Sequence, residues 1–138
     1  MKKSLPKAIK TELAPDPVGP YNQAIFIENW LYCSGQIALD PSTGTMVGNG
    51  DIKQEARQVL KNLLAVIKAA GGESSNVIKT TIYLTDLNDF ATVNKIYSET
   101  FSNMTSPARA CVEVSNLPKG AKIEIDCIAF INQEGKTT

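Results

Sequence analysis

The sequence predicts an α+β fold, in which two helices cover one face of a mixed sheet of about five or six strands. Residues 51–72 and residues 88–101 carry apolar side chains at helical spacing. Short segments before, between and after them alternate polar and apolar residues, which is typical of strands. Because 138 residues is an ordinary size for one domain, we expect residues 1–138 to form a single domain.

The first part of the chain predicts turns, a hairpin and a loop. Residues 1–20 are rich in proline and lysine, which favours turns. The stretch "AIFIENWLYCSG", residues 24–35, predicts two short strands that turn at Glu28-Asn29 and stop at Gly35. The following residues, "DPSTGTMVGNG", predict a loop.

The first helix has the clearest local signals. Asp51 is a plausible N-cap, and Gln54 three residues later would complete a capping box. Gly71-Gly72 predicts the end of the helix. One apolar stripe at helical spacing predicts the face that packs on the sheet: Ile52, Ala56, Val59, Leu60, Leu63, Leu64 and Ile67.

A strand, a second helix and two more strands follow. Residues 76–86 alternate as a strand, and Asn88 is a plausible cap for the second helix. The last two strands are expected at residues 109–115 and 122–132. Two sets are expected to face the core, namely Ile78, Thr80, Ile82 and Leu84 in the strand, and Phe90, Val93, Tyr97 and Phe101 in the helix.

Period-two alternation divides the last two strands into two faces. We expect the helix side to receive Ala110, Val112, Val114, Ile123, Ile125, Cys127 and Ala129. The other side would carry Arg109, Cys111, Glu113, Glu124, Asp126, Ile128 and Phe130. Exposing Ile128 and Phe130 to water would cost about 25 cal/mol per Å² of apolar surface, so we expect this face to pack against other copies of the chain.

Charge and hydropathy exclude several partners. The formal net charge is zero, and no basic stripe predicts a nucleic-acid surface. No apolar run approaches the length of a membrane span, and the basic N-terminal residues are not followed by an apolar leader segment. We therefore expect a cytoplasmic protein with no nucleic-acid and no membrane partner.

The absence of histidine excludes several chemistries. Neither a Ser-His nor a Cys-His nucleophilic pair can form, and imidazole cannot act as an acid, a base or a metal ligand. The cysteines Cys33, Cys111 and Cys127 have no CxxC spacing and an odd count, so they read as reduced thiols. We expect neither a metal nor a cofactor.

The C-terminal stretch "PARACVEVSNLPKGAKIEIDCIA" closely resembles the signature of the Rid (YjgF-like) family. The stretches "PVGPYNQAI", "LYCSGQIALDPSTG", "EARQVLKNLLAVIKAAG" and "VIKTTIYLTDLNDFATVN" follow the order and spacing of that family over nearly the whole chain. Within the family the sequence looks most like the RidA group, the 2-iminobutanoate/2-iminopropanoate deaminases. The resemblance implies a chorismate-mutase-like fold and a homotrimer, with a central barrel and three pockets at subunit interfaces.

The resemblance also implies roles for two charged residues. Arg109 would bind the substrate carboxylate, for which a guanidinium fork is well suited. Glu124 would activate the attacking water and return a proton to the leaving ammonia. The alternative is structural: an ion pair of Arg109 with Glu113 or Glu124, or a glutamate satisfied by backbone N–H groups.

Five further positions match pocket residues of the family. Cys111 would line the pocket rather than act as a nucleophile, because no histidine can activate it and only Arg109 could lower its pKa. Tyr21, Ser34, Gly35 and Asn94 would contact the substrate. For Tyr21, Ser34 and Asn94, a turn-packing tyrosine, a strand-end serine and an exposed helix asparagine remain the simpler interpretations.

The function that this resemblance implies is hydrolysis of reactive 2-imino or enamino acids to 2-keto acids and ammonia, a metabolite damage-control role. The alternative is a non-enzymatic trimer that binds 2-keto acids through Arg109. Ribonuclease activity or translation inhibition has less support, because the chain is neutral and has no strip of aromatic and basic residues.

Overall fold

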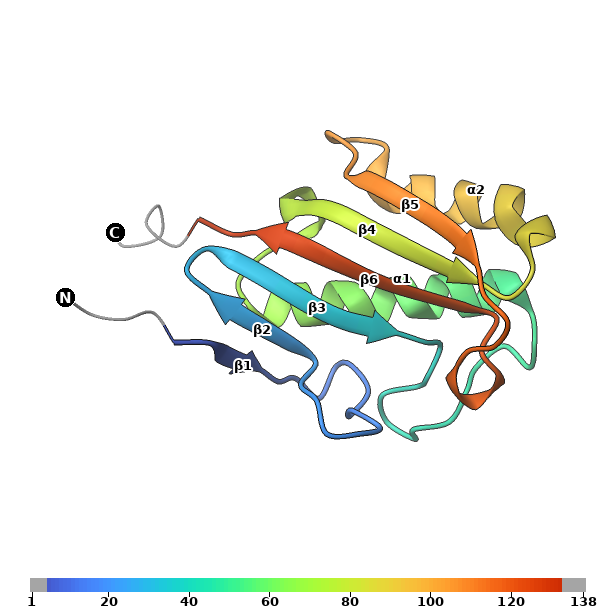
Figure 1. The fold of residues 1–138 in the computed structure, drawn as a ribbon, viewed down its shortest axis with the longest axis horizontal. Helices are drawn as coiled ribbons and strands as arrows, with labels where there is room; N and C mark the ends of the chain where they lie inside the picture. The colour runs from blue at the N-terminus through green and yellow to red at the C-terminus, as the bar shows by residue number, and fades with distance from the viewer. Residues whose placement is uncertain (1–4, 133–138) are drawn as a thin grey trace.

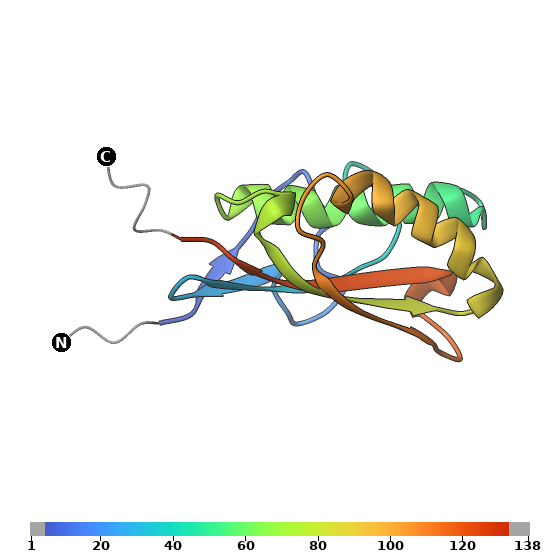
Figure 2. The same ribbon diagram turned by 90° about the horizontal axis from the view of Figure 1, so that it is seen from above.

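A computed structural model describes residues 5–132. It has one six-stranded sheet in the order β1-β2-β3-β6-β4-β5 (Figure 1). Both α-helices lie on the same side of this sheet, as the view from above shows (Figure 2). The predicted α+β class with two helices on one face of a mixed sheet is confirmed.

The strands pair antiparallel except at one edge. Strands β4 and β5 are parallel, and helix α2 forms the crossover between them. The predicted hairpin is present as β2 and β3, with Glu28 at a φ of 56° in the turn, and β3 continues past Gly35 to Gln36. The strands are β1 (Lys7–Ile9), β2 (Ala24–Ile27), β3 (Trp30–Gln36), β4 (Val77–Leu84), β5 (Ala108–Glu113) and β6 (Ile123–Phe130).

Helix α1 spans Ile52–Ala69 and begins as predicted. The Asp51 side chain accepts a hydrogen bond from the Lys53 backbone N–H (2.9 Å). The Gln54 amide donates to the Asp51 carboxylate (3.3 Å), so the two side chains pair with each other and no reciprocal capping box forms. Gly71, at a φ of 90°, follows the last turn.

Helix α2 spans Phe90–Phe101 and begins differently from the prediction. Asn88 does not cap it, because a short 3₁₀ turn, Leu87–Asp89, precedes the helix. The Asp86 carboxylate accepts from the Asn88 backbone N–H, so the aspartate two residues earlier provides the cap of this turn. Phe90 begins the helix and is 38% exposed, unlike the rest of the predicted apolar stripe, which is buried.

Strand β4 faces the core with three of its four predicted residues. Thr80, Ile82 and Leu84 are almost fully buried, whereas Ile78 is 47% exposed. The pairing with β6 shifts register between Val77 and Lys79, which moves Val77 into the core in place of Ile78. The prediction for Ile78 was wrong because alternation alone does not reveal a β-bulge.

Three buried polar side chains fix loops to the core, and the apolar pattern did not predict them. The Asn62 amide on α1 donates to the Ile37 and Leu39 carbonyl oxygens. Glu55 is 1% exposed, and its carboxyl group accepts from the Lys122 backbone N–H (2.9 Å). Burial raises the pKa of Glu55. Gln23 binds the N-terminal segment through its amide, as described below.

The two faces of β6 are as predicted. Ile123, Ile125, Cys127 and Ala129 are buried against the helices. Ile128 and Phe130 lie on the open side, where the Phe130 ring contacts Trp30 edge to face at 4.9 Å between centroids.

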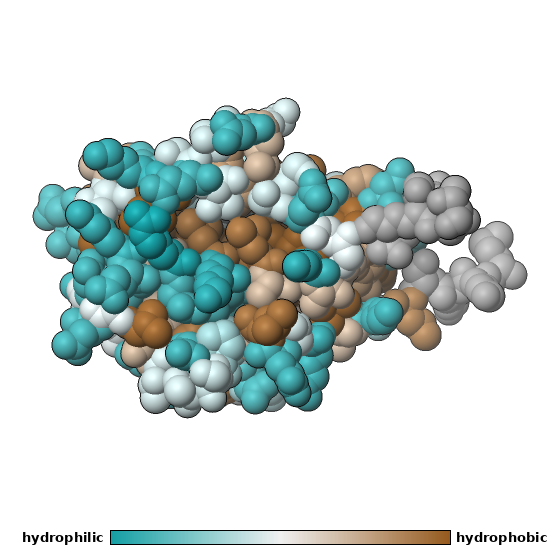
Figure 3. Space-filling view, turned by 180° about the vertical axis from the view of Figure 1, so that it is seen from behind, coloured by the Kyte–Doolittle hydropathy of each residue, from teal (hydrophilic) through white to brown (hydrophobic). Residues whose placement is uncertain are grey.

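The helix-bearing side, seen from behind, has hydrophobic residues in its middle and hydrophilic residues around them (Figure 3).

The two faces of β5 are the reverse of the prediction. Arg109 and Cys111 pair in parallel register with Thr80 and Ile82, whose side chains face the helices. Residues at the same level of paired strands share a face. Val112, predicted to lie in the core, is therefore on the open side and is 42% exposed.

No helix within residues 5–132 is long and apolar enough to cross a membrane.

Candidate functional site

Glu124 lies on the open face of the sheet. It sits on β6 between Ile123 and Ile125, both fully buried on the opposite face. It borders a hollow of about 40 Å³, which is enough for a water molecule. Tyr21, Gly35 and Pro118 also border this hollow, whose walls therefore come from β6, β3 and two loops. We call Tyr21, Gly35 and Glu124 the carboxylate half-site.

The Glu124 carboxyl group is half-buried and uncommitted. Among the described residues none donates a hydrogen bond to it and none forms an ion pair with it. Burial raises the pKa of Glu124, and the nearby Asp126 carboxylate raises it further. Asp126 accepts a hydrogen bond from the Tyr83 hydroxyl (3.1 Å). Glu124 is therefore a stronger base than an ordinary carboxylate and has no partner within the described chain.

Gly35 is the neighbour that Glu124 requires. A Cβ at this position would overlap the Glu124 carboxylate and would lie 2.9 Å from its Cγ. Only a residue without a side chain leaves the carboxyl group in its place, although the flexible end of Glu124 could swing away.

We therefore expect Gly35→Ala to fold normally and to have a kcat/KM for the expected imine hydrolysis that is lower by about 10- to 100-fold. The reason is that a displacement of a catalytic group by about 1 Å slows a reaction strongly. The measurement is kcat/KM together with the thermal midpoint of unfolding. An unchanged kcat/KM would contradict the placement of Glu124 in the reaction.

Tyr21 and Ser34 are held by local hydrogen bonds. The Tyr21 hydroxyl accepts from the Val18 backbone N–H (3.2 Å), and its ring is 45% exposed beside the hollow. The Ser34 hydroxyl donates to the Asn22 carbonyl oxygen (2.6 Å) and does not border the hollow. Tyr21 is thus available to a ligand, whereas Ser34 is already engaged.

Gln23 organises this part of the site and was not predicted. Its amide group is buried, accepts from the Thr11 backbone N–H (2.7 Å), and donates to the Thr11, Ala14 and Pro15 carbonyl oxygens. These bonds fix the proline-rich segment that forms one wall of the hollow. No residue-type pattern in the sequence distinguishes such a glutamine from a surface one.

Arg109 lies on the edge strand β5, where its side chain packs against α2. Its Nη1 donates to the Asn94 Oδ1 (2.7 Å). Its guanidinium carbon lies 5.0 Å from the centroid of the Tyr97 ring and 5.6 Å from that of Phe90. Together with Cys111, these residues form the guanidinium half-site: Phe90, Asn94, Tyr97, Arg109 and Cys111. Arg109, Asn94 and Tyr97 line an open groove of about 560 Å³.

The structural alternative for Arg109 is not observed. Within the described part of the chain the one ion pair joins Arg57 to Glu99. Glu113 instead accepts a hydrogen bond from the Leu87 backbone N–H (2.9 Å). Arg109 therefore keeps its charge unpaired and available to an anion.

Cys111 is half-buried beside Arg109. Burial raises the pKa of its thiol, and the Arg109 charge offsets only part of this effect. The thiol is thus protonated at neutral pH and is a poor nucleophile. Cys33 and Cys127 are buried opposite each other on β3 and β6, and their contact and burial raise the pKa of Cys127.

We expect Cys111→Ser to retain kcat within about tenfold of the wild type, because a residue that only lines a pocket is dispensable for the chemistry. Steady-state kinetics checks this. A loss of about 10²- to 10⁴-fold in kcat, the usual range for removal of a group that takes part in the chemistry, would in a folded protein instead identify the thiol as a nucleophile.

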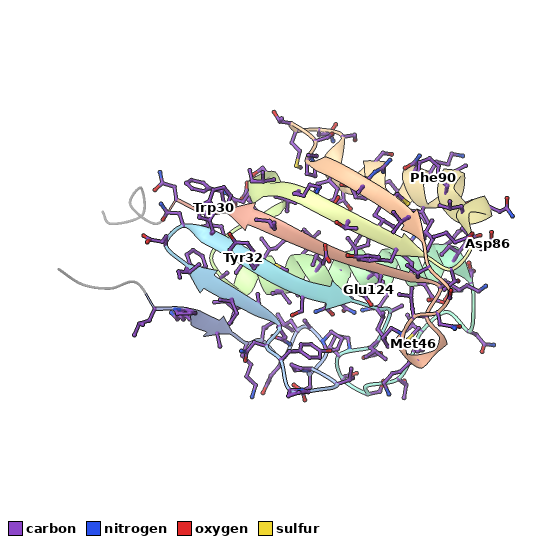
Figure 4. The ribbon with its side chains drawn as sticks, in the orientation of Figure 1. Trp30, Tyr32, Met46, Asp86, Phe90 and Glu124 are labelled. Carbon is purple, nitrogen blue, oxygen red and sulfur yellow. The ribbon has the colours of Figure 1, made fainter. Side chains whose placement is uncertain are left out.

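The two half-sites do not converge within one protomer. Strand β4 lies between β5 and β6, so Arg109 and Glu124 do not project from neighbouring strands, and the expectation that they share the uncovered face was wrong. They also lie on opposite faces, Arg109 against α2 and Glu124 on the open side. Figure 4 shows the separation between Phe90 on α2 and Glu124 on β6.

The fold and the two half-sites define a small α+β protein with an unpaired arginine at one edge and an uncommitted carboxyl group on the open face of its sheet. The chain belongs to the family described as Endoribonuclease L-PSP, whose model matches residues 11–131.

Three relatives illustrate the similarity. A RutC family protein of Synechocystis is 54% identical over 125 residues, covering 91% of this chain and 96% of the relative. The human 2-iminobutanoate/2-iminopropanoate deaminase is 48% identical over 124 residues, covering 90% and 89%. A crystal structure of a Rid family protein from Yersinia pestis superimposes with a TM-score of 0.89 at 47% identity, covering 92% and 100%. The resemblance to the Rid family is confirmed.

Proposed function

We propose that this protein hydrolyses 2-imino and enamino acids to 2-keto acids and ammonia, as a 2-iminobutanoate/2-iminopropanoate deaminase. The observation that carries the proposal is the uncommitted Glu124 carboxyl group beside a hollow of water size, in a chain that also keeps Arg109 unpaired. Relatives about 48% identical, from human and Salmonella typhimurium, carry the name of this activity.

The reaction needs two groups and no histidine. The Arg109 guanidinium binds the substrate carboxylate through its N–H groups and orients the C=N carbon. Glu124 takes a proton from water as the oxygen adds to the carbon of the protonated imine. It then gives that proton to the nitrogen of the tetrahedral intermediate. As the C–N bond breaks and the C=O bond forms, the hydroxyl proton passes to the Glu124 carboxylate and from there to ammonia, which leaves as ammonium.

Since one protomer cannot bring Arg109 and Glu124 together, the proposed site is shared between two copies. The guanidinium half-site of one copy would meet the carboxylate half-site of the next. Such a heterologous contact closes in a ring, and a homotrimer with three equivalent sites is the assembly that the family resemblance implies. Trp30, Tyr32 and Val112, exposed on the open face by 39%, 48% and 42%, support burial of this face against other copies.

The test couples the protein to a source of imine. Added to a threonine dehydratase reaction, the protein should increase the initial rate of ammonia and 2-oxobutanoate formation, and Arg109→Ala should abolish the increase. Lys95→Ala, an exposed position on α2, is a matched control that should retain it. A folded wild-type protein without any acceleration would contradict the proposal.

Two outcomes favour other functions. Tight calorimetric binding of 2-oxobutanoate without imine hydrolysis would identify a 2-keto-acid-binding trimer. RNA cleavage at a rate that depends on Arg109 and Glu124 would favour the activity that the family description names. Removal of reactive intermediates in the cytoplasm is the cellular role that we infer, and the location stays a prediction.

A further inference from the structure

The Arg109 guanidinium is held by three side chains of one helix. Phe90, Asn94 and Tyr97 are spaced four and three residues apart, so they lie along one side of α2. Asn94 accepts one hydrogen bond from Nη1, and the two rings contact the guanidinium at 5.0 and 5.6 Å. A cation over an aromatic ring at such a distance is attracted by the ring quadrupole.

The ring of Tyr97 is itself fixed. Its hydroxyl shares a hydrogen bond of 2.7 Å with Thr80 on β4, and its ring packs against Phe101 at 4.7 Å between centroids. Thr80 is in register with Arg109 on the neighbouring strand. One side of the guanidinium contact is thus anchored to the sheet, whereas Phe90, at the exposed start of α2, is held by the helix alone.

We propose that Phe90 and Tyr97 are positioning residues that hold the Arg109 guanidinium, so that its unbonded N–H groups are presented to the substrate carboxylate. Apart from the bond to Asn94, these N–H groups make no hydrogen bond with any described residue. An arginine on an edge strand otherwise loses side-chain freedom when it binds a ligand, and an arginine ordered in advance does not. The proposal rests on the role of Arg109 in the proposed function.

The proposal predicts a change in binding and not in chemistry. The carboxylate is held equally in the ground state and the transition state, so loss of preorganisation raises KM and leaves kcat nearly unchanged. Phe90→Leu should raise KM and the Kd for 2-oxobutanoate by about three- to tenfold, with kcat within about twofold. Phe90→Tyr, which keeps the ring, should restore both constants.

A second readout does not depend on turnover. The NMR signal of the Arg109 Nε–H group, assigned by its loss in Arg109→Lys, should show restricted motion in the wild type and greater motion in Phe90→Leu. Tyr97→Phe keeps the ring and loses only the hydrogen bond to Thr80. It should therefore lower the thermal midpoint of unfolding and raise KM by less than Phe90→Leu does. Lys95→Ala on the same helix should change none of these quantities.

Wild-type mobility of Arg109 and a wild-type Kd in Phe90→Leu would overturn the proposal, as would an equal loss in Phe90→Tyr. A wild-type protein that binds 2-oxobutanoate but hydrolyses no imine would contradict the proposed function alone. The Kd and NMR comparisons would then still decide whether the rings position Arg109.

Discussion

Replacing Glu124 with glutamine is expected to lower kcat about 10²- to 10⁴-fold, the usual range for loss of a general base. Glutamine has nearly the same shape as glutamate and cannot accept the proton of the attacking water. Since no described residue forms a hydrogen bond or ion pair with the Glu124 carboxylate, the substitution breaks none of these and the fold should be retained. Initial rates with 2-iminobutanoate, together with the thermal midpoint of unfolding, measure the two effects separately.

The pH dependence of the wild type provides a check on the same residue. Glu124 must be deprotonated to act as a base, so kcat/KM should fall as the pH falls through its pKa. Burial first, and then the Asp126 carboxylate, raise this pKa above its ordinary value of 4.5, which moves the acid limb of the profile to higher pH.

Asp126→Asn should therefore move the acid limb to lower pH. Tyr83→Phe is the matched control, because this variant removes the hydrogen bond to Asp126 but leaves the Asp126 and Glu124 carboxylates in place. An acid limb that is the same in Glu124→Gln and in the wild type would show that another group controls the rate.

Most of the architecture follows from local sequence signals. The apolar stripe of α1, its Asp51 cap and the turn at Glu28-Asn29 are properties of neighbouring residues, and the structure has all three. The errors arise where a distant partner decides. Ile78 turns outward because β4 shifts register against β6, and Asn88 is displaced as a cap because Asp86 binds its backbone.

Strand β5 shows why the site itself was harder to predict. Alternation correctly separated Arg109 and Cys111 from Ala110 and Val112, but it does not say which set faces the helices. The apolar set was assigned to the core on hydrophobicity. The structure instead turns Arg109 to the helix side at the exposed edge of the sheet, where Asn94 and two aromatic rings of α2 provide it with partners.

An apolar set on the open face is what the proposed assembly requires, in which helices cover one face of the sheet and other copies cover the other. Hydrophobic patterning then cannot distinguish the faces, since both are expected to be apolar. The buried amide groups of Gln23 and Asn62 escaped prediction for a related reason. Their partners are backbone carbonyls of loops at other places in the chain.

Mixing two inactive variants is expected to restore activity, because the proposed site takes Arg109 from one protomer and Glu124 from the next. Arg109→Ala alone should lower kcat/KM about 100-fold or more, since it leaves the substrate carboxylate without its charged partner. When Arg109→Ala and Glu124→Gln subunits are unfolded together and reassembled at random, a site is intact only if each half comes from the right variant. About one quarter of the sites should then be active.

The reciprocal mixture distinguishes a shared site from one within a protomer. Wild-type subunits reassembled with an equal amount of the double variant should give about one quarter of wild-type activity if the site is shared, and about one half if both residues act in the same protomer. If both residues act in the same protomer, the mixture of Arg109→Ala and Glu124→Gln subunits would stay inactive. Because Arg109 and Glu124 lie on opposite faces with β4 between their strands, we expect the result of a shared site.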